Sequence, residues 1–294
     1  MFIATLVSDQ EAASGLELLN TPFMINALIA GTLIALASGA IGYFVLLRDL
    51  PFATHAVAHI GFPGATLAVL LGVSAVFGLI AACTIGGLAI GAMGHRARNR
   101  EVVPGTVLAF ATGLGILFNR LGSAQTNLLT NLLFGNILAI TTDQVVVFAV
   151  IVAIVLAVLA LIGRKLLFAS VDPDVAAARG LNTRALSAVF LVAMSLIIAI
   201  SVTVVGVLLI FALLVTPAAT AIRLTAKPTL VVALASVIAL VSVWGGLIVA
   251  TYQPWPPSFV ITTIACVFWV LLPQLARLRG PVAAPQIATQ TASS

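Results

Sequence analysis

The sequence predicts an all-α polytopic membrane protein with about nine transmembrane helices. Of its 294 residues, 62% are hydrophobic and only 7% are charged, whereas soluble domains carry about 25% charged residues. The mean hydropathy is +1.25. Apolar runs recur along most of the chain, and many are long enough to cross a bilayer. These three observations exclude a soluble globular domain.

Each expected span is an apolar run close to the roughly 20 residues that a membrane-crossing helix needs. Eight or ten spans remain possible, because several runs are separated by only a few residues. One such boundary, 201–206, is compatible with a kink as well as with a turn. The nine expected spans are 23–47, 51–71, 73–94, 102–119, 143–163, 185–204, 206–222, 229–250 and 257–276.

Charge placement predicts the orientation of the spans, since Lys and Arg concentrate on the cytoplasmic side. With the N-terminus outside, 12 of the 13 basic residues fall in inner segments and only Arg120 lies outside. We therefore expect a multi-pass membrane protein with a cytoplasmic C-terminus. The outer side keeps the acidic residues Asp9, Glu11, Glu17 and Asp143, which would mildly favour an approaching cation. A sequence pI near 10.0 then reflects orientation and not nucleic-acid binding.

The chain divides into an outer N-terminal segment (1–20), a transmembrane domain (21–279) and a cytoplasmic tail (280–294). The tail is rich in Ala, Thr, Gln and Ser and is expected to be disordered. The N-terminal segment lacks the basic region of a cleavable signal peptide. Cys83 and Cys266 lie in different spans without partner spacing, so we interpret both as small apolar packing residues.

The second inner loop is expected to contain a short helix. Asp172 suits its N-cap, and Pro173 suits the first helical position, with Asp174 beside it. Gly180, directly after Arg179, suits the left-handed C-terminal cap. So short a helix is marginal in water, so it must dock against its own bundle or against a partner protein.

Other patterns concern packing and loops. The apolar stretch 132–140 is too short to span, so we expect it to be re-entrant or to lie on the surface. Gly87 and Gly91 have GxxxG spacing, which favours close helix packing. The tetrapeptides ProGlyAlaThr (63–66) and ProAlaAlaThr (217–220) fall in spans of opposite direction and suggest a trace of an inverted repeat. Three asparagines are interpreted as caps of helix ends: Asn127, Asn131 and Asn136.

His55 and His59 are the best clue to the chemistry. They stand four residues apart in an apolar span, so a helix places both on one face. A polar group inside the membrane is costly unless something satisfies it, which makes such residues functional candidates. Neutral imidazole suits Zn, Cu, Fe and Ni as a ligand. Two ligands would form half a site, completed by a partner subunit, water or backbone carbonyls, while ordinary hydrogen-bonded packing is the alternative.

Two enzymatic functions are disfavoured. The HxxxH spacing also occurs in zinc metalloproteases, which need a glutamate directly after the first histidine. This chain has Ala56 there. The only lysines, Lys165 and Lys227, do not belong to a phosphate-binding P-loop, so any ATP must be hydrolysed by another chain. We expect no enzymatic activity and no permanently bound cofactor.

The chain resembles the membrane permeases of bacterial ATP-binding-cassette importers for zinc, manganese and iron. The likeness covers about residues 20 to 279 and is carried by RDLPFATHAVAHIGFPGA (48–65), LFGNILAI (133–140) and VGVLLIFALLVTPAATA (205–221). It implies a type II importer fold similar to the vitamin B12 importer's permease, with two copies around a central pathway. Each copy would bind a cytoplasmic ATPase through the short helix after Asp172, and an extracytoplasmic metal-binding protein would dock outside.

In manganese members of this family, the aligned motif has an aspartate at the position of His55 and a histidine at His59, and that pair is implied to contact the ion. Replacing a carboxylate by imidazole shifts the metal preference toward zinc. The sequence therefore predicts the permease subunit of an ATP-driven importer for a divalent transition-metal ion, with zinc favoured over manganese. A gradient-driven secondary transporter or channel is the alternative, and it would not need a docked cytoplasmic helix.

Overall fold

The computed structural model describes residues 20–92, 102–122, 126–207, 209–253 and 255–278, and every regular element in this part of the chain is a helix. The expectation of an all-α fold is therefore confirmed. Our expectations for residues 1–19 and for the tail concern residues outside these ranges. The helices are α2 (Pro22–Leu47), α3 (Pro51–Leu70), α4 (Ala75–Ala92), α6 (Val102–Leu121), α7 (Thr126–Phe134), η1 (Ile137–Ala139), α8 (Thr142–Val171), α9 (Pro173–Ala178), α10 (Thr183–Val205), α11 (Ile210–Leu214), α12 (Thr216–Leu224), α13 (Pro228–Tyr252) and α14 (Pro257–Leu278).

Within the described residues, seven helices are long and apolar enough to cross a membrane: α2, α3, α4, α8, α10, α13 and α14. Two shorter apolar stretches, Gly105–Leu121 and Ile210–Leu224, occupy the places of the other two expected spans. The fifth expected span is longer than predicted, because α8 has 30 residues and ends at Val171 instead of at 163. At 1.5 Å per residue it is about 45 Å long, which exceeds the roughly 30 Å of a bilayer's hydrocarbon core.

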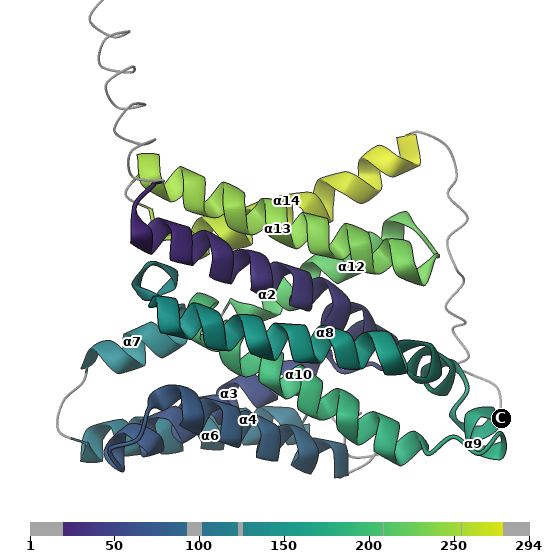
Figure 1. Ribbon diagram of the computed structural model, residues 1–294, viewed down its shortest axis with the longest axis horizontal. Coiled ribbons are helices and arrows are strands. Elements are labelled where there is room, and N and C mark those ends of the chain that lie inside the picture. The colour runs from purple at the N-terminus through teal and green to yellow at the C-terminus, as the bar shows by residue number, and fades with distance from the viewer. Residues whose placement is uncertain (1–19, 93–101, 123–125, 208, 254, 279–294) are drawn as a thin grey trace, which may run out of the picture.

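The helices form three groups (Figure 1). One group holds α3, α4 and α6, a second holds α12, α13 and α14, and the third, α2, α8 and α10, lies between them. The start of α2 and helix α7 lie at one end of the bundle, and α9 lies at the opposite end. The histidine-bearing helix α3 therefore belongs to a flanking group, where it packs against α4, α6 and α10.

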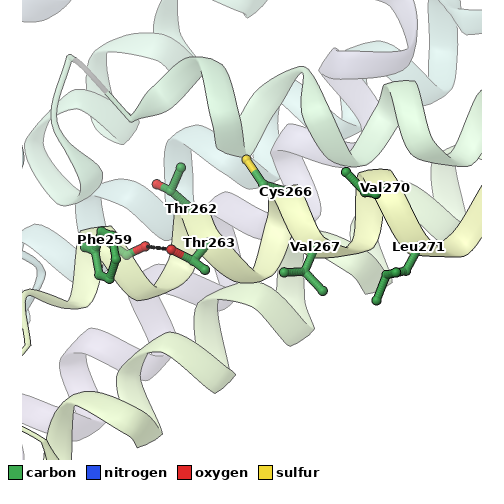
Figure 2. Close-up of a pocket in the computed structure, with 7 residues that line it drawn as sticks. All are labelled: Phe259, Thr262, Thr263, Cys266, Val267, Val270 and Leu271. Carbon is green, nitrogen blue, oxygen red and sulfur yellow. Dashed lines mark hydrogen bonds between the residues drawn. The ribbon is translucent and has the colours of Figure 1, made fainter.

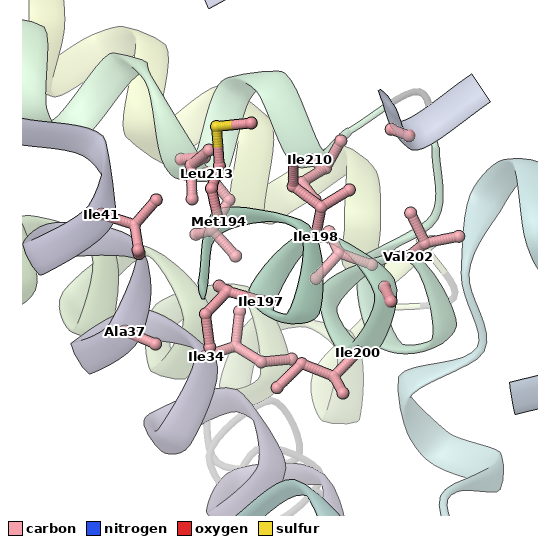
Figure 3. Packing of buried hydrophobic residues seen from close by; sticks show 14 of the residues in the cluster. Ile34, Ala37, Ile41, Met194, Ile197, Ile198, Ile200, Val202, Ile210 and Leu213 are labelled. Carbon is pink, nitrogen blue, oxygen red and sulfur yellow. The ribbon is translucent and has the colours of Figure 1, made fainter. Parts of the chain in front are cut away.

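Helices α2 and α10 form the centre of the core. In each, 72% of the most apolar stretch is buried, against 28% in α4 and in α8. Figure 3 shows Ile34 and Ile41 of α2 beside Met194 and Ile197 of α10, with Leu213 of α11 next to them. Helices that are apolar all round suit such a buried position. α3 and α11 thus rest on a well-packed centre.

The seventh expected span is discontinuous. α10 ends at Val205, and Gly206 follows with φ +89°, so a turn and not a kink occupies this boundary. α11 then ends at Leu214, and Pro217 lies in the first turn of α12, where its missing N–H costs no helical hydrogen bond. By contrast, α3 continues through Pro63.

The helix contacts support the inverted repeat suggested by the two tetrapeptides. With α2 to α4 as one half and α10 to α13 as the other, α2 packs along α13 and α10 packs along α4, so the first helix of each half contacts the last helix of the other half. α8 contacts both α2 and α10.

The stretch 132–140 crosses the end of α10. Gly135 has φ +76° and lies against Gly206, and a Cβ added to either glycine would collide with the backbone of the other's segment. The Val207 N–H donates to the Leu132 carbonyl at 3.0 Å. Two of the three stretches that carried the family resemblance therefore meet at this crossing.

The capping interpretation of the asparagines is wrong for two of them. Asn136 precedes η1, but its side chain makes no capping bond there and donates to Asn131 at 3.5 Å. Asn131 lies inside α7. The side chain of Asn127 lies outside the described part of the chain.

The packing interpretations hold for the glycines and for one cysteine. A Cβ added to Gly87 or Gly91 would collide with a side chain of α10, so these glycines allow α4 and α10 to approach closely. Cys83 is buried as expected. Cys266 is exposed on the surface of α14, so its interpretation as a packing residue is wrong.

Candidate functional site

His55 and His59 lie on one face of α3, as their spacing predicts. The helix begins at Pro51, a residue that suits the first turn. The two imidazole rings approach edge to face, with centroids 4.7 Å apart and an interplanar angle of 69°. His59 is only 6% exposed, and His55 is half-buried. Two imidazoles therefore share one small volume inside the bundle.

Two neighbouring helices each contribute one residue to this volume. On α6, the Thr112 Oγ1 lies 3.1 Å from the His59 Nδ1. On α11, the Phe211 ring lies 6.0 Å from the His55 ring at an interplanar angle of 82°. The histidine pair is therefore located where α3 meets α6 and the discontinuous segment.

The opposite face of α3 is anchored to α4. The Cys83 thiol lies 3.5 Å from the Val57 carbonyl oxygen. Gly64 and Gly78 pack so closely that a Cβ on either would collide with the carbonyl oxygen of the other. These contacts determine the rotation of α3 and with it the direction of the histidine face.

The pair offers two imidazole ligands without further metal-binding side chains. In the described residues, no group of three or more His, Cys, Asp or Glu side chains could hold a metal ion. The His55 Nδ1 is buried and has no hydrogen-bond partner there. A buried polar atom left unsatisfied costs about 1–3 kcal/mol, so binding a ligand would relieve that cost. No carboxylate follows His55, since the next residue is Ala56.

The expected short helix is present as α9. The Asp172 carboxylate accepts from the Val175 N–H at 3.0 Å, and Pro173 opens the helix. Gly180 follows Arg179 with φ +79°, and the Leu181 N–H donates to the carbonyl of the buried Ala176. Together with the bond from the Gly180 N–H to the Ala177 carbonyl, these are the features of a Schellman C-cap.

Most of α9 faces away from the bundle. Asp174 and Val175 are exposed, as is Arg179, whose guanidinium nevertheless lies 5.5 Å from the centre of the Phe168 ring on α8. The helix is therefore held at the end of α8 while leaving an exposed surface.

A groove of about 490 Å³ lies on the surface of α14 (Figure 2). Its hydroxyl groups are already bonded, because Thr262 donates to Ser258 and Thr263 donates to Phe259 in the same helix. Apart from the Cys266 thiol, the groove presents no available ligand atom. It is separate from the histidine pair, and we assign no metal site to it.

A family model described as the ABC 3 transport family matches residues 20–275. The chain belongs to this family. The match covers nearly all of the described residues, and it confirms the family expected from the three resembling stretches, the membrane permeases of ATP-binding-cassette metal importers. The permease is thus a multi-pass membrane protein.

Curated relatives of the permease cover most of its length. It is 32% identical over 236 residues to the manganese transport system membrane protein MntC of Listeria monocytogenes, spanning 78% of this chain and 82% of that protein. The high-affinity zinc uptake system membrane protein ZnuB of Haemophilus influenzae is 28% identical, and the match spans 81% of this chain and 92% of ZnuB. The relatives therefore carry the names of both metals.

Solved structures support the fold. The permease aligns with a chain of PsaBC from Streptococcus pneumoniae, solved with a Fab, at a TM-score of 0.80 and 24% identity, covering 92% of this chain and 100% of that chain. A metal-chelate type ABC transporter in an inward-facing conformation aligns at a TM-score of 0.61 and 15% identity, covering 87% and 86%. The expected likeness to the vitamin B12 importer's permease is tested by neither and stays a prediction.

Thr112 and Phe211 were not singled out from the sequence. A hydroxyl in an apolar helix usually bonds to a carbonyl of its own helix, so Thr112 carries no distinguishing signal. Phe211 falls within the third resembling stretch, 205–221, but is one of several large apolar residues there. Both are identified only by the contact of their helices with α3.

Proposed function

We propose that this chain is the permease subunit of an ATP-driven importer that moves a divalent transition-metal ion inward, with His55 and His59 contacting the ion. The observation that carries the proposal is the pair of rings 4.7 Å apart on α3, beside the discontinuous segment. Zinc binds imidazole nitrogen at about 2.0–2.1 Å, so one ion can contact both rings. Two protein ligands hold an ion weakly, which suits transport because the ion must leave.

We propose zinc as the preferred ion over manganese. The two imidazoles suit a borderline metal, whereas manganese prefers oxygen ligands. Further ligands would come from water, backbone carbonyls or a second permease copy. The names of the relatives, manganese for MntC and zinc for ZnuB, include both metals.

ATP hydrolysis would be supplied by partner subunits. We propose that α9, with Asp172, Pro173, Asp174, Arg179 and Gly180, is the contact with the ATPase. Its caps are formed within the chain, and its exposed side chains are available to a partner. The assembly would comprise two permease copies, two cytoplasmic ATPases and an extracytoplasmic metal-binding protein. The permease would then be neither an enzyme nor the carrier of a resident cofactor.

The proposed topology has nine crossings in the inner membrane. The seven candidate spans would be joined by α6 and by the α11–α12 segment, in the type II importer arrangement. The bundle end that carries α9 would be cytoplasmic, with the N-terminus outside.

Metal accumulation in a strain that lacks the chromosomal permease tests the proposal. Complementation with the wild-type chain should restore zinc accumulation, and His59→Ala should not, at equal protein levels in the membrane. Unchanged accumulation with His59→Ala would overturn the role of the pair. Uptake that persists after deletion of the ATPase partner would support a gradient-driven carrier instead.

A further inference from the structure

We propose that Thr112 is a positioning residue for His59: it holds the imidazole as the Nδ1–H tautomer and leaves the Nε2 lone pair for the ion. The inference rests on the proposed function, since it takes His59 to contact the transported metal. It extends the site from α3 to α6.

The Thr112 hydroxyl has one hydrogen and two close partners. Its oxygen lies 2.8 Å from the Leu108 carbonyl oxygen and 3.1 Å from the His59 Nδ1. The first distance is typical of an O–H···O bond, and the second fits an N–H···O bond. Because the carbonyl can only accept, the hydroxyl donates to Leu108 and accepts from the Nδ1–H of His59. A neutral histidine that donates from Nδ1 carries its lone pair on Nε2.

The contact between α3 and α6 is fixed around this bond. Phe62, three residues after His59, is 1% exposed, and its ring lies against Gly115, three residues after Thr112. A Cβ at Gly115 would collide with the Phe62 ring. The two contacts lie about one helical turn apart, so the helices cannot slide without losing both. Thr112 therefore remains opposite His59.

His55 lacks an equivalent partner. Its Nδ1 is buried without a hydrogen bond in the described part of the chain, and its neighbour on α11 is the apolar ring of Phe211. The site thus combines a ligand that is oriented in advance, His59, with one that is oriented when the ion binds. Removing the partner that orients a metal-binding histidine typically costs 10–100-fold in metal affinity.

The tautomer can be measured directly by nitrogen-15 NMR of the purified full-length permease labelled in its histidine rings, since the chain has only 3 histidines. We expect His59 to be the Nδ1–H form in the wild type and in Thr112→Ser. Thr112→Val keeps the shape of the side chain but removes the acceptor, so it should shift His59 toward the Nε2–H form. A Thr112→Val spectrum identical to the wild type would overturn the inference.

Zinc binding gives a second readout. Thr112→Val should raise the dissociation constant of zinc, measured on the purified permease, by about 10–100-fold, and Thr112→Ser should restore the wild-type affinity. Thr203→Val is the matched control, because the Thr203 hydroxyl also donates to its own helix, at the Ala199 carbonyl. A purely structural role for Thr112 would instead lower the amount of permease in the membrane and leave the tautomer unchanged.

The two proposals fail in different ways. Unchanged uptake with His59→Ala would overturn the proposed function itself. Loss of uptake with His59→Ala, together with an unchanged tautomer and an unchanged zinc affinity in Thr112→Val, would overturn only the role of Thr112.

Discussion

The two candidate ligands differ at the scale of single residues, although they share a helix face. His59 is almost fully buried and bonds to Thr112, whereas His55 is half-buried, leaves Nδ1 without a described partner and faces the Phe211 ring. His55 is also the position at which the sequence predicts a departure from the manganese members of the family. A substitution at His55 that changes the ligand atom is therefore the simplest test of what determines metal preference.

His55→Asp is expected to raise manganese uptake relative to zinc uptake, because a carboxylate oxygen suits manganese better than imidazole does. A tenfold change in the ratio corresponds to about 1.4 kcal/mol in relative binding. Competitive uptake of radioactive zinc and manganese in complemented cells measures the ratio. His55→Asn supplies a neutral oxygen and should change the ratio less. A ratio that His55→Asp leaves unaltered would contradict the assignment.

Gly206→Ala is expected to destabilise the permease. Gly206 has φ +89° and ψ 160°, a conformation that is essentially restricted to glycine and costs other residues about 1–3 kcal/mol. The added Cβ would also collide with the Gly135 segment. Thermal unfolding in detergent should show a lower Tm. Gly72→Ala is the control, since its φ is +76° but nothing lies within 4 Å of an added Cβ, and an equal loss of Tm there would refute the importance of the crossing.

At the scale of elements, the short helices α9 and α11 are too short to be stable alone, and caps and contacts with neighbouring helices stabilise them. α9 has only 6 residues, yet its N-cap, its C-cap and the contact of Arg179 with Phe168 are all present. α11 has 5 residues and ends before Pro217. Helices this short are marginally stable alone. Loss of a capping residue should therefore also weaken the contacts that the helix makes with a partner.

Asp172→Ala should weaken the association with the ATPase. The substitution removes the N-cap bond to the Val175 N–H, which is worth about 1 kcal/mol. Asp172→Asn keeps an oxygen acceptor for the Val175 N–H but removes the negative charge. Comparing the two variants distinguishes the effect of the N-cap bond from the effect of the charge. Copurification of the ATPase with the tagged permease measures the effect. Equal recovery of the ATPase with Asp172→Ala and with wild type would argue against α9 as the contact.

At the scale of the whole molecule, the central helices link the two halves, α2 to α4 and α10 to α13. α2 packs on α13, α10 packs on α4, and α8 contacts both central helices. The histidine-bearing α3 belongs to one half, and the discontinuous α11–α12 segment, the corresponding part of the other half, reaches it through Phe211. The proposed ion path therefore lies where the two halves meet, as expected for an inverted repeat.

The orientation of the molecule can be tested with cysteines introduced one at a time in a Cys266→Ser background, in which the remaining Cys83 is buried. Val73→Cys, in the exposed turn after α3, should react with a membrane-impermeant maleimide in intact spheroplasts, because that end of the bundle is expected to be outside. Ala177→Cys, on the exposed side of α9, should react only after permeabilisation. Labelling of Ala177→Cys, but not of Val73→Cys, in intact spheroplasts would contradict the proposed orientation.

The sequence by itself determined the membrane class, the location of most spans, the caps of α9 and the shared face of His55 and His59. Each of these depends on composition or on residues a few positions apart, which helix geometry brings together without help from the rest of the chain. The same local reasoning failed at Asn136 and Cys266, where the outcome depended on which surfaces meet other helices.

Only the tertiary structure decided which residues complete the surroundings of the histidines. Thr112 is 53 positions from His59, and Phe211 lies on another helix still further along the chain, so neither spacing nor composition could pair them. The crossing of Gly135 with Gly206 and the two breaks around α11 likewise arise from backbone packing between distant segments. Contacts such as that of Phe62 with Gly115 fix the rotation and register of α3 against α6. They place Thr112 beside His59, so that the two histidines gain a third partner.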